Sequence, residues 1–554
     1  MFVTTLSSTR FLASLLVGLA LGSARLEAQS TIHVSPQGND AWLGIAPAGC
    51  GPVGPKRTLQ AALDAVDPGG LVLVADGLYA GAGNRDLDFR GKPARLQSRG
   101  GAERCVVECG GSASEAHRGF WFHTSESASS VVAGFTVRGG VAPFGGAVLC
   151  EASSSPTFES CAFLENLALP AAVGGEGGAV RCLASSPRFV ACRFARNEAR
   201  RAAGVGGRGG AIQFVGGQPE LRDCVFEANT AGGGGGVHIT GVSTLRALRC
   251  DFVGNWTADP NFNGGGGLLG SSGTAIELLE CRFLGNRTAR VAGAVWVTLG
   301  ASIAATRCSF EENYGYDAAC FGVANGSRAQ LKSCLFARNR ADTFSAALEV
   351  WNGPATGAPA SARVESCTFA DNETSAGYGT IVVLHTSQIS VSSSVIWSAA
   401  PVALALFDSA TAEVAYSVVQ GGWPGLGNLD VDPGFVGSGA QPYALGAGSP
   451  CVDQGDPLLA IAPAERDLAG ACRAWDGDGD ALARVDRGAY ERLAPRGDLD
   501  GDGAIGALDL QLLVAHLHLS SGARVADGDL DGDGDVDPDD LQALLASWGL
   551  GCGL

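Results

Sequence analysis

The sequence predicts an elongated all-β solenoid, a parallel β-helix, followed by a small all-α domain. One observation behind this fold class is a pattern of Cys, any residue, Phe, any two residues and Asn, which occurs eight times between residues 161 and 372. Another is a pair of acidic loops after residue 494, each followed by a segment that is apolar on one face. Glycine, at 82 of 554 residues, suits many tight bends, and 46% hydrophobic residues can form a long core.

The charge of the chain narrows the range of partners. Lys and Arg total 38 against 56 Asp and Glu, which gives a formal net charge of -18. Because nucleic-acid binding depends on clustered positive charge, and no basic patch stands out along the chain, we expect no nucleic acid among the partners.

The first 28 residues predict a secretory signal peptide. Arg10 precedes an apolar run from Phe11 to Leu21, and small residues follow, with cleavage expected after Ala24 or Ala28. A membrane anchor is the alternative, but the run is well short of the ~20 apolar residues that span a bilayer. We therefore expect a secreted or cell-surface protein without a membrane span in the mature chain, in a compartment that permits disulfides.

Residues 29–69 predict a strand and a helix that caps the solenoid. Leu59, Ala62, Leu63 and Val66 follow helical spacing, and Thr58 can accept a hydrogen bond at the start of the helix. Such a helix would cover the open end of the first coil and protect its strand edges from pairing with other chains.

The β-helix itself is predicted for residues 70–430. Cys and Phe lie two residues apart in the repeat, so both side chains face the same side of a strand. The residue three before each Cys is apolar in every copy, and a bend between the two would turn both inward. One unit cannot bury its own apolar face, so we expect roughly twelve stacked coils. The copies begin at Cys161, Cys192, Cys224, Cys250, Cys281, Cys308, Cys334 and Cys367.

Stacking places equivalent residues of successive coils in columns. We expect a Phe column, a Cys column and, at one turn, an Asn column whose side chains bond neighbouring main-chain groups. The Cys column has two interpretations. Adjacent coils set Cβ atoms ~4.8 Å apart, outside the usual disulfide range, which favours buried thiols, with disulfides between rungs as the alternative.

A second repeated element is Gly-Gly-Ala-(Val/Ile), which begins at Gly145, Gly177 and Gly209. Together with Phe-x-x-Asn, it resembles the repeats of polymorphic outer-membrane proteins. The resemblance implies an all-β right-handed parallel β-helix of the pectin-lyase-like class. Residues 431–494 are similar to the closing segment of secreted proteins of this class. This segment is rich in loops, so we expect a disulfide between Cys451 and Cys472 to hold it together.

Residues 495–554 contain two copies of a metal-binding loop pattern, 31 residues apart. Alternate carboxylates, one backbone carbonyl and a closing acid can surround a hard cation, and the carbonyl is that of Ala504 in the first loop and of Asp535 in the second. The predicted ligands are Asp498, Asp500, Asp502, Ala504 and Asp509 in the first loop, and Asp529, Asp531, Asp533, Asp535, Asp537 and Asp540 in the second. In the first loop Gly506 replaces one side-chain ligand, so water must serve there. Helices are predicted over 508–518 and 538–548.

The repeated loop and helix, with Asp rather than Glu at the closing position, resembles a type I dockerin. The resemblance implies a small all-α calcium-binding domain with Ca²⁺ as cofactor, bound by the acids named above. It also implies a cohesin-like or cell-surface protein as partner. A solvated acidic linker is the alternative, and the fixed offset of two matching loops favours calcium.

Pectin-lyase-like folds carry both enzymes and adhesins, so the fold leaves activity open. The sequence shows no carboxylate trio typical of a hydrolase, and the catalytic residues are unknown. Three scattered histidines are interpreted as wall or turn residues: His123, His238 and His385. Four acids are candidates for catalysis, with solvated turns as an equal interpretation: Asp317, Glu349, Asp371 and Glu373. The leading hypothesis is an exported, non-catalytic β-helix protein with an extended adhesion or glycan-binding surface. The alternative is a divergent polysaccharide lyase or glycoside hydrolase.

Overall fold

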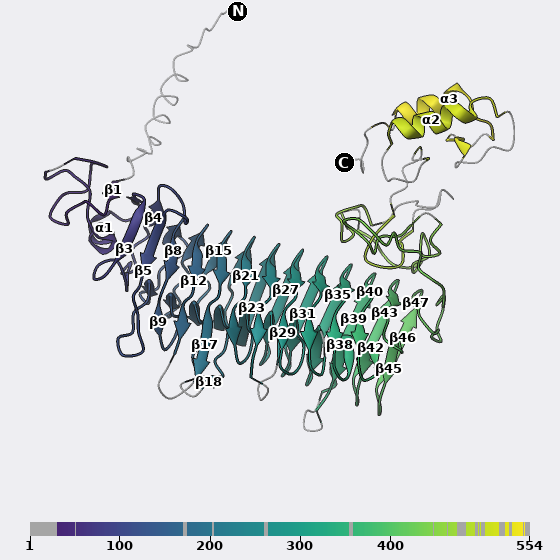
Figure 1. Cartoon of the computed structure of the whole chain (residues 1–554), viewed down its shortest axis with the longest axis horizontal. Helices are drawn as coiled ribbons and strands as arrows, with labels where there is room; N and C mark the ends of the chain where they lie inside the picture. Colours follow the sequence, from purple (N-terminus) through teal and green to yellow (C-terminus); the bar gives the residue numbers. More distant parts are fainter. Residues whose placement is uncertain are drawn as a thin grey trace, which may run out of the picture.

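The β-helix is a long stack of coils with a helical cap before the first coil and an irregular closing segment after the last (Figure 1). The computed structural model describes residues 30–49, 51–169, 174–201, 204–259, 264–318, 320–353, 358–446, 448–462, 464–473, 484–492, 497, 499, 505–519, 527–530, 534–546 and 548. The predicted signal peptide lies outside the described residues.

A complete coil contributes one strand to each of four parallel sheets. In one such coil β10 (Val148–Cys150) lies in sheet C, β11 (Thr157–Glu159) in sheet A, β12 (Ala162–Leu164) in sheet B and β13 (Leu167–Ala168) in sheet D. Each of these strands pairs in register with its equivalent in the next coil. Sheet B has 13 strands, so the predicted parallel solenoid of roughly twelve coils is confirmed.

The remaining strands belong to the same four sheets. Sheet A contains β1 (Thr31–Val34), β2 (Leu71–Val74), β4 (Arg95–Ser98), β7 (Val131–Ala133), β15 (Arg188–Val190), β20 (Glu220–Arg222), the second half of β23 (Val237–Leu248), β27 (Ala275–Leu279), β31 (Ser302–Thr306), β35 (Arg328–Lys332), β39 (Ser361–Glu365), β43 (Gln388–Ser392) and β46 (Thr411–Ala415). Sheet B contains β3 (Gly77–Ala80), β5 (Cys105–Glu108), β8 (Thr136–Arg138), β16 (Arg193–Ala195), β21 (Val225–Glu227), β24 (Asp251–Val253), β28 (Arg282–Leu284), β32 (Ser309–Glu311), β36 (Leu335–Ala337), β40 (Thr368–Ala370), β44 (Val395–Trp397) and β47 (Val418–Val419). Sheet C contains β6 (Phe120–Phe122), β14 (Val180–Leu183), β19 (Ile212–Gly217), the first half of β23, β26 (Leu268–Gly270), β30 (Val295–Val297), β34 (Phe321–Ala324), β38 (Ser345–Trp351), β42 (Gly379–Val383) and β45 (Leu404–Leu406). Sheet D contains β9 (Val141–Ala142), β17 (Glu198–Arg201), β22 (Thr230–Ala231), β25 (Trp256–Thr257), β29 (Arg287–Thr288), β33 (Tyr314–Gly315), β37 (Arg340–Ala341) and β41 (Glu373–Thr374), with β18 (Gly204–Val205) antiparallel to β17.

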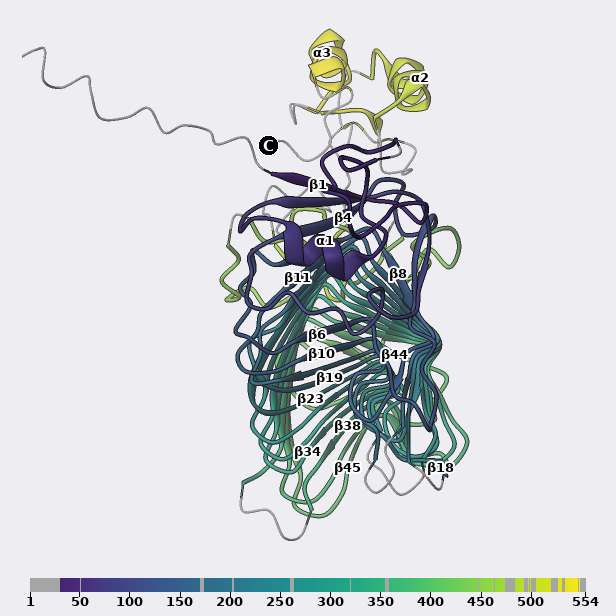
Figure 2. The same cartoon turned by 90° about the vertical axis from the view of Figure 1, so that its left-hand side faces the viewer.

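The predicted helix precedes the first full coil as α1 (Leu59–Ala65). The hydroxyl of Thr58 accepts a hydrogen bond from the Ala61 N–H at 3.3 Å, which caps the helix as predicted. Leu59, Ala62 and Leu63 pack into the main core. Figure 2 shows α1 lying across the end of the stack, so the helix covers the otherwise open core of the first coil.

Phenylalanine rings form the predicted column through the core. In sheet B the ring centroids of Phe226 and Phe252 lie 4.7 Å apart, and those of Phe252 and Phe283 lie 4.4 Å apart. The predicted bend before each ladder Cys is a single residue in the left-handed region, such as Asp223 with a φ of 53° and Arg249 with a φ of 49°. This conformation is costly for residues with a Cβ, so the contacts of the stack must hold it.

The asparagine column is a continuous hydrogen-bonded ladder. The main-chain N–H and the side-chain Nδ2 of Asn229 both donate to Oδ1 of Asn255, at 3.1 and 2.9 Å. Nδ2 of Asn255 donates to the main-chain oxygen of Phe226 at 2.9 Å. The column runs from Asn166 to Asn372, and its side chains are at most 1% exposed. The asparagine side chains therefore provide hydrogen-bond partners for backbone groups at the turn that are not paired within the sheets.

The ladder cysteines are buried free thiols, the first of the two predicted alternatives. The Cys334 N–H donates to Sγ of Cys367 at 3.4 Å, and the Cys334 thiol donates to the Lys332 carbonyl oxygen at 3.3 Å. After Cys367, serines continue the column, because the Cys367 N–H donates to the Ser394 hydroxyl and the Ser394 N–H to the Ser417 hydroxyl. A hydroxyl at the same position in later coils indicates that each thiol has two functions. It takes part in the hydrogen bonds of the column, and it packs as a small apolar side chain in the core.

The hydrogen bonds of the thiols predict that replacing one ladder cysteine by serine or by alanine will have different effects on stability. The Cys308 sulfur accepts from the Cys281 N–H at 3.4 Å, and its thiol donates to the Thr306 oxygen at 3.4 Å. Because serine retains both functions, we expect Cys308→Ser to change the free energy of unfolding by about 1 kcal/mol or less, and Cys308→Ala to cost about 2 kcal/mol. Urea denaturation followed by circular dichroism measures both. Equal losses would mean that only apolar volume matters.

The closing segment, described over 429–446, 448–462, 464–473 and 484–491, folds back over the outer face of sheet B. Tyr443, Ala489 and Tyr490 cluster with Leu335 of sheet B, and the Ala489 N–H donates to the Thr368 hydroxyl at 2.9 Å. The outward positions of sheet B are polar or charged in several earlier coils and are mostly apolar beneath this segment, with Thr368 as a polar exception. Burial beneath the closing segment therefore explains why most of these outward residues lose their polarity.

The predicted Cys451–Cys472 disulfide is wrong. Cys451 is a buried free thiol that packs with Val395 and Val418 of sheet B, and burial raises its pKa to about 12. Cys472 lies instead in a short antiparallel bridge with Arg466. Packing against sheet B stabilises the segment in the way that the prediction assigned to a disulfide.

Candidate functional sites

The outer face of sheet C holds one buried acid, Glu349 in β38. Its side chain lies between two core residues in the strand, so it points outward, yet it is only 7% exposed. Its Oε2 atom has no hydrogen-bond partner among the described residues. The neighbouring strand has Gly322 at this position, under the ring of Trp296. Burial, with the negative charge of Asp317, raises the pKa of Glu349 to about 7, so its interpretation as a solvated turn is wrong.

Glu349 should make the stability of the β-helix depend on pH. Its pKa rises from 4.5 to about 7 on folding, so the folded protein holds the proton more tightly than the unfolded chain. This tighter proton binding stabilises the folded state by roughly 3 kcal/mol in all. The stabilisation is complete below about pH 4.5 and is lost as the pH rises through 7. We expect the urea midpoint of Glu349→Gln to fall less between pH 5 and pH 8 than that of the unmodified protein. Glu373→Gln, which removes an exposed acid, should retain the full dependence, and an unchanged profile in Glu349→Gln would contradict the assignment.

The other predicted acids do not converge on Glu349 in a hydrogen-bonded group. Asp317 accepts a hydrogen bond from the Thr343 hydroxyl at 3.0 Å. Asp371 is an exposed turn residue that accepts from the Tyr443 hydroxyl at 2.9 Å, and Glu373 is exposed in sheet D. Asp371 therefore helps to hold the closing segment.

The histidines lie at separate places on the wall. His238 is buried in sheet C with Nδ1 2.7 Å from Oε1 of Gln213, and burial lowers its pKa to about 3. It is therefore neutral at physiological pH, a wall residue as predicted. His385 lies at a turn with Nδ1 2.8 Å from Oδ2 of Asp408, and His123 directly follows β6.

A polar groove crosses the outer face of sheet A in its last coils, over β35, β39, β43 and β46. Two adjoining hollows of about 460 and 550 Å³ share Arg363, Ser390 and Glu413. Small side chains between long ones create the depression, and Pro424 and Gly425 border one end. The lining of the first hollow also includes Arg328, Gln330, Ser361, Gln388 and Thr411.

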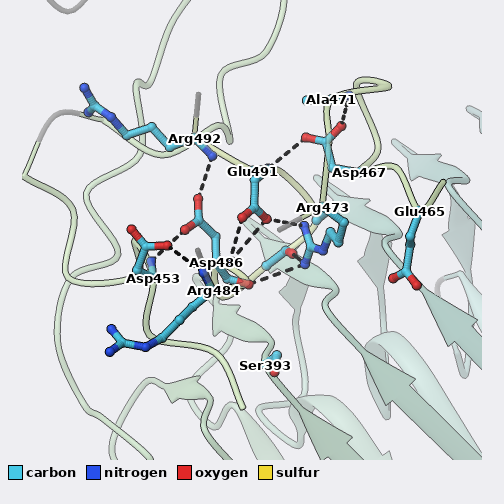
Figure 3. Close-up of polar contacts among 12 residues, drawn as sticks. Ser393, Asp453, Glu465, Asp467, Ala471, Arg473, Arg484, Asp486, Glu491 and Arg492 are labelled. Atoms are coloured by element: carbon cyan, nitrogen blue, oxygen red, sulfur yellow. Dashed lines mark hydrogen bonds and ion pairs between the residues drawn. The ribbon is translucent and has the colours of Figure 1, made fainter. Parts of the chain in front are cut away.

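A cluster of buried carboxylates organises the closing segment (Figure 3). Asp486 accepts hydrogen bonds from the N–H groups of Asp453 at 2.7 Å and Arg492 at 2.6 Å, while Arg473 and Glu491 form an ion pair at 3.4 Å. Burial raises the pKa of Asp486 to about 7 and that of Glu491 well above its usual value. Main-chain N–H groups occupy both oxygens of Asp486, so its role is structural. Its partners follow no repeat, so no sequence pattern could have revealed the cluster.

The C-terminal region repeats one loop-and-helix unit, with helices α2 (Ala507–His516) and α3 (Pro538–Ala546). Asp509 accepts from the N–H groups of Leu499 and Gly506, each at 2.7 Å. Asp540 makes the equivalent pair of bonds 31 residues later, at 2.6 and 2.7 Å. The two units share a small apolar core of Ile505, Leu513, Leu530, Val536 and Leu544. None of the described helices has the length and apolar character needed to cross a bilayer.

Three predicted ligands of the second loop come together. Asp535, Asp537 and Asp540 each offer a carboxylate oxygen, and these oxygens lie within 4.8 Å of one another. Calcium takes oxygen ligands at about 2.3–2.6 Å, so the set fits one ion. Asp535 contributes a side chain here, whereas its backbone carbonyl was the predicted ligand. Asp529 is also buried, and its Oδ2 accepts from the Gly534 N–H at 3.1 Å. Six predicted ligands lie outside the described residues: Asp498, Asp500, Asp502, Ala504, Asp531 and Asp533.

Two family models match separate regions of the chain. Residues 232–419 match the right handed beta helix region, and residues 496–546 match the dockerin type I domain. The protein is thus a right-handed parallel β-helix followed by a dockerin type I domain, as the sequence predicts.

Two solved polysaccharide lyases are similar to the chain at low identity. A pectate lyase, Pel9A, is 13% identical with a TM-score of 0.39, over 84% of this chain and 98% of that one. A rhamnogalacturonan lyase is 11% identical with a TM-score of 0.31, over 74% of this chain and 90% of that one. Such values carry no argument about activity. No curated protein matches the chain significantly.

Proposed function

We propose that the protein is exported and uses its β-helix as an extended glycan-binding or adhesive surface, attached through its dockerin domain. The observation that carries the proposal is the presence in one chain of a long, laddered β-helix and a dockerin domain with its own core. A rigid stack presents a fixed surface, and a separate domain can bind a partner without disturbing it.

The dockerin domain supplies the attachment in this proposal. Calcium bound by Asp535, Asp537 and Asp540 would neutralise their charges and fix the second loop against α3. The test mixes the full chain with purified type I cohesin modules, in calcium and in chelator. Binding to at least one module in calcium, lost in chelator, is expected. Retention by none of them, or binding that chelator leaves intact, would reject the attachment.

The β-helix supplies the glycan-binding surface. Its outer faces are rich in polar side chains, and the groove over sheet A offers hydrogen-bonding groups from successive coils. Electrophoresis of the full chain through gels that contain neutral or acidic polysaccharides tests this surface. We expect at least one polysaccharide to slow the protein. Equal mobility in every gel would reject glycan binding.

Polysaccharide cleavage is the second candidate, and Glu349 favours it. A buried carboxyl with a pKa near 7 can act as a general acid or base, and the charge of Asp317 contributes to that pKa. Incubation with polyuronides and neutral polysaccharides, followed by absorbance of unsaturated ends and by reducing-sugar release, tests it. Activity that disappears in Glu349→Gln would establish cleavage, and no product from any substrate would exclude it for those substrates.

A further inference from the structure

The groove over sheet A contains an arginine without an ion-pair partner among the described residues, Arg328. It is exposed at the start of β35 and lines the first hollow. Arg363, in the next coil, is bound to Glu365 at 2.8 Å. In a chain with a formal net charge of -18, an unpaired guanidinium within a depression is a local site for an anion.

The rest of the groove offers hydrogen-bonding groups in rows along the rod. Ser361, Gln388 and Thr411 follow Arg328 in one register row, one residue per coil. Their side chains make no hydrogen bonds to other described residues, so their donors and acceptors are available to a ligand. Hydroxyl groups of a sugar chain laid along the rod would meet such a group at every coil, about 4.8 Å apart.

The charges give the groove a direction. Arg328 lies at one end of the rows, and the exposed Glu413 lies three coils further on in the neighbouring row. An anionic group is attracted at the first end and repelled at the second, where the carboxylate can accept hydrogen bonds from hydroxyls.

We propose that this groove binds an anionic polysaccharide along the rod, with a carboxylate or sulfate on Arg328 and sugar hydroxyls on the polar row. The inference rests on the proposed glycan-binding function and assigns it to one surface and one ligand class. Guanidinium pairs with oxyanions through two parallel N–H bonds, so Arg328 contributes both attraction and orientation.

The experiment compares two arginine substitutions in the full chain. Arg328→Gln removes the groove charge, and Arg246→Gln is the matched control. Arg246 is also exposed on sheet A but lies outside the groove and pairs with Glu277 at 2.9 Å. The probes are a uronate hexasaccharide, its carboxyl-reduced neutral form and a sulfated hexasaccharide, measured by calorimetry. We expect an anionic probe to bind the unmodified chain and Arg246→Gln equally, and Arg328→Gln about tenfold more weakly.

The outcomes separate this inference from the broader function. Binding of the uronate or the sulfated probe identifies the anionic group. Equal affinities of the two variants, or equal binding of the neutral probe, would overturn the groove assignment. If polysaccharide gels slow Arg328→Gln as much as the unmodified chain, the protein binds glycans but the groove is not the binding site. If no gel slows the unmodified chain, both the glycan-binding function and the groove assignment are rejected.

Discussion

Replacing Asn255 by alanine is expected to destabilise the β-helix by about 4 kcal/mol. The substitution leaves the main-chain N–H and the Nδ2 of Asn229 without their shared acceptor, and the Phe226 oxygen without its donor. All three groups lie in a ladder that excludes water, and each unpaired buried group costs about 1–3 kcal/mol. Urea denaturation followed by circular dichroism measures the loss.

The control is Asp251→Ala in the same coil. Asp251 forms a partly exposed ion pair with Arg282 at 3.0 Å, and surface pairs of this kind contribute about 1 kcal/mol at most. Asn255→Asp should behave like the alanine variant, because a carboxylate cannot donate to the Phe226 oxygen and would be buried with its charge. If Asn255→Ala unfolds at the same urea concentration as Asp251→Ala, the ladder is not a main source of stability.

Asp540→Asn should weaken calcium binding to the second loop by at least tenfold. The change removes one of the three carboxylates that converge there, together with its charge. Calorimetric titration of the full chain is expected to show about two bound ions, one of which becomes weak in the variant.

Asp539→Asn is the matched control for this prediction. Asp539 is the adjacent acid in α3, is exposed and lies outside the carboxylate cluster. Removing its charge should leave calcium affinity nearly unchanged, because exposed charges are strongly screened. Equal weakening by the two substitutions would mean that overall charge, not the cluster, determines binding, and no heat with the unmodified chain would reject the calcium site.

The sequence could predict the β-helix because strand periodicity and the repeat coincide. Cys and Phe two residues apart define the inner face of a strand, and eight copies show that each strand meets its own equivalent. The docking of the closing segment was harder to predict. Its signal was the loss of polarity at outward positions of sheet B, from Arg193 and Arg282 to Leu335 and Val395. Because the sequence does not show this contact directly, it leaves a disulfide as the local interaction that could stabilise the closing segment.

The candidate sites also differ in how far the sequence alone could predict them. The predicted calcium ligands are close together in the sequence, since each loop pattern places its acids within about twelve residues, so spacing alone is enough to propose them. Glu349, Asp371 and Glu373 look alike in the sequence, and only the fold buries Glu349 against Gly322 and its neighbours on sheet C. The groove is also invisible in the sequence, because its depth comes from the heights of side chains in four different coils.

The docking of the closing segment determines where the chain departs from the β-helix. Ala489 is bonded to Thr368 of β40, and sheet B continues beyond it through β44 and β47. Ala489 therefore lies on the flank of the rod rather than at its tip. A molecule held by this flank would lie sideways on its support, with its final coils and its capped end both projecting beyond the point of contact.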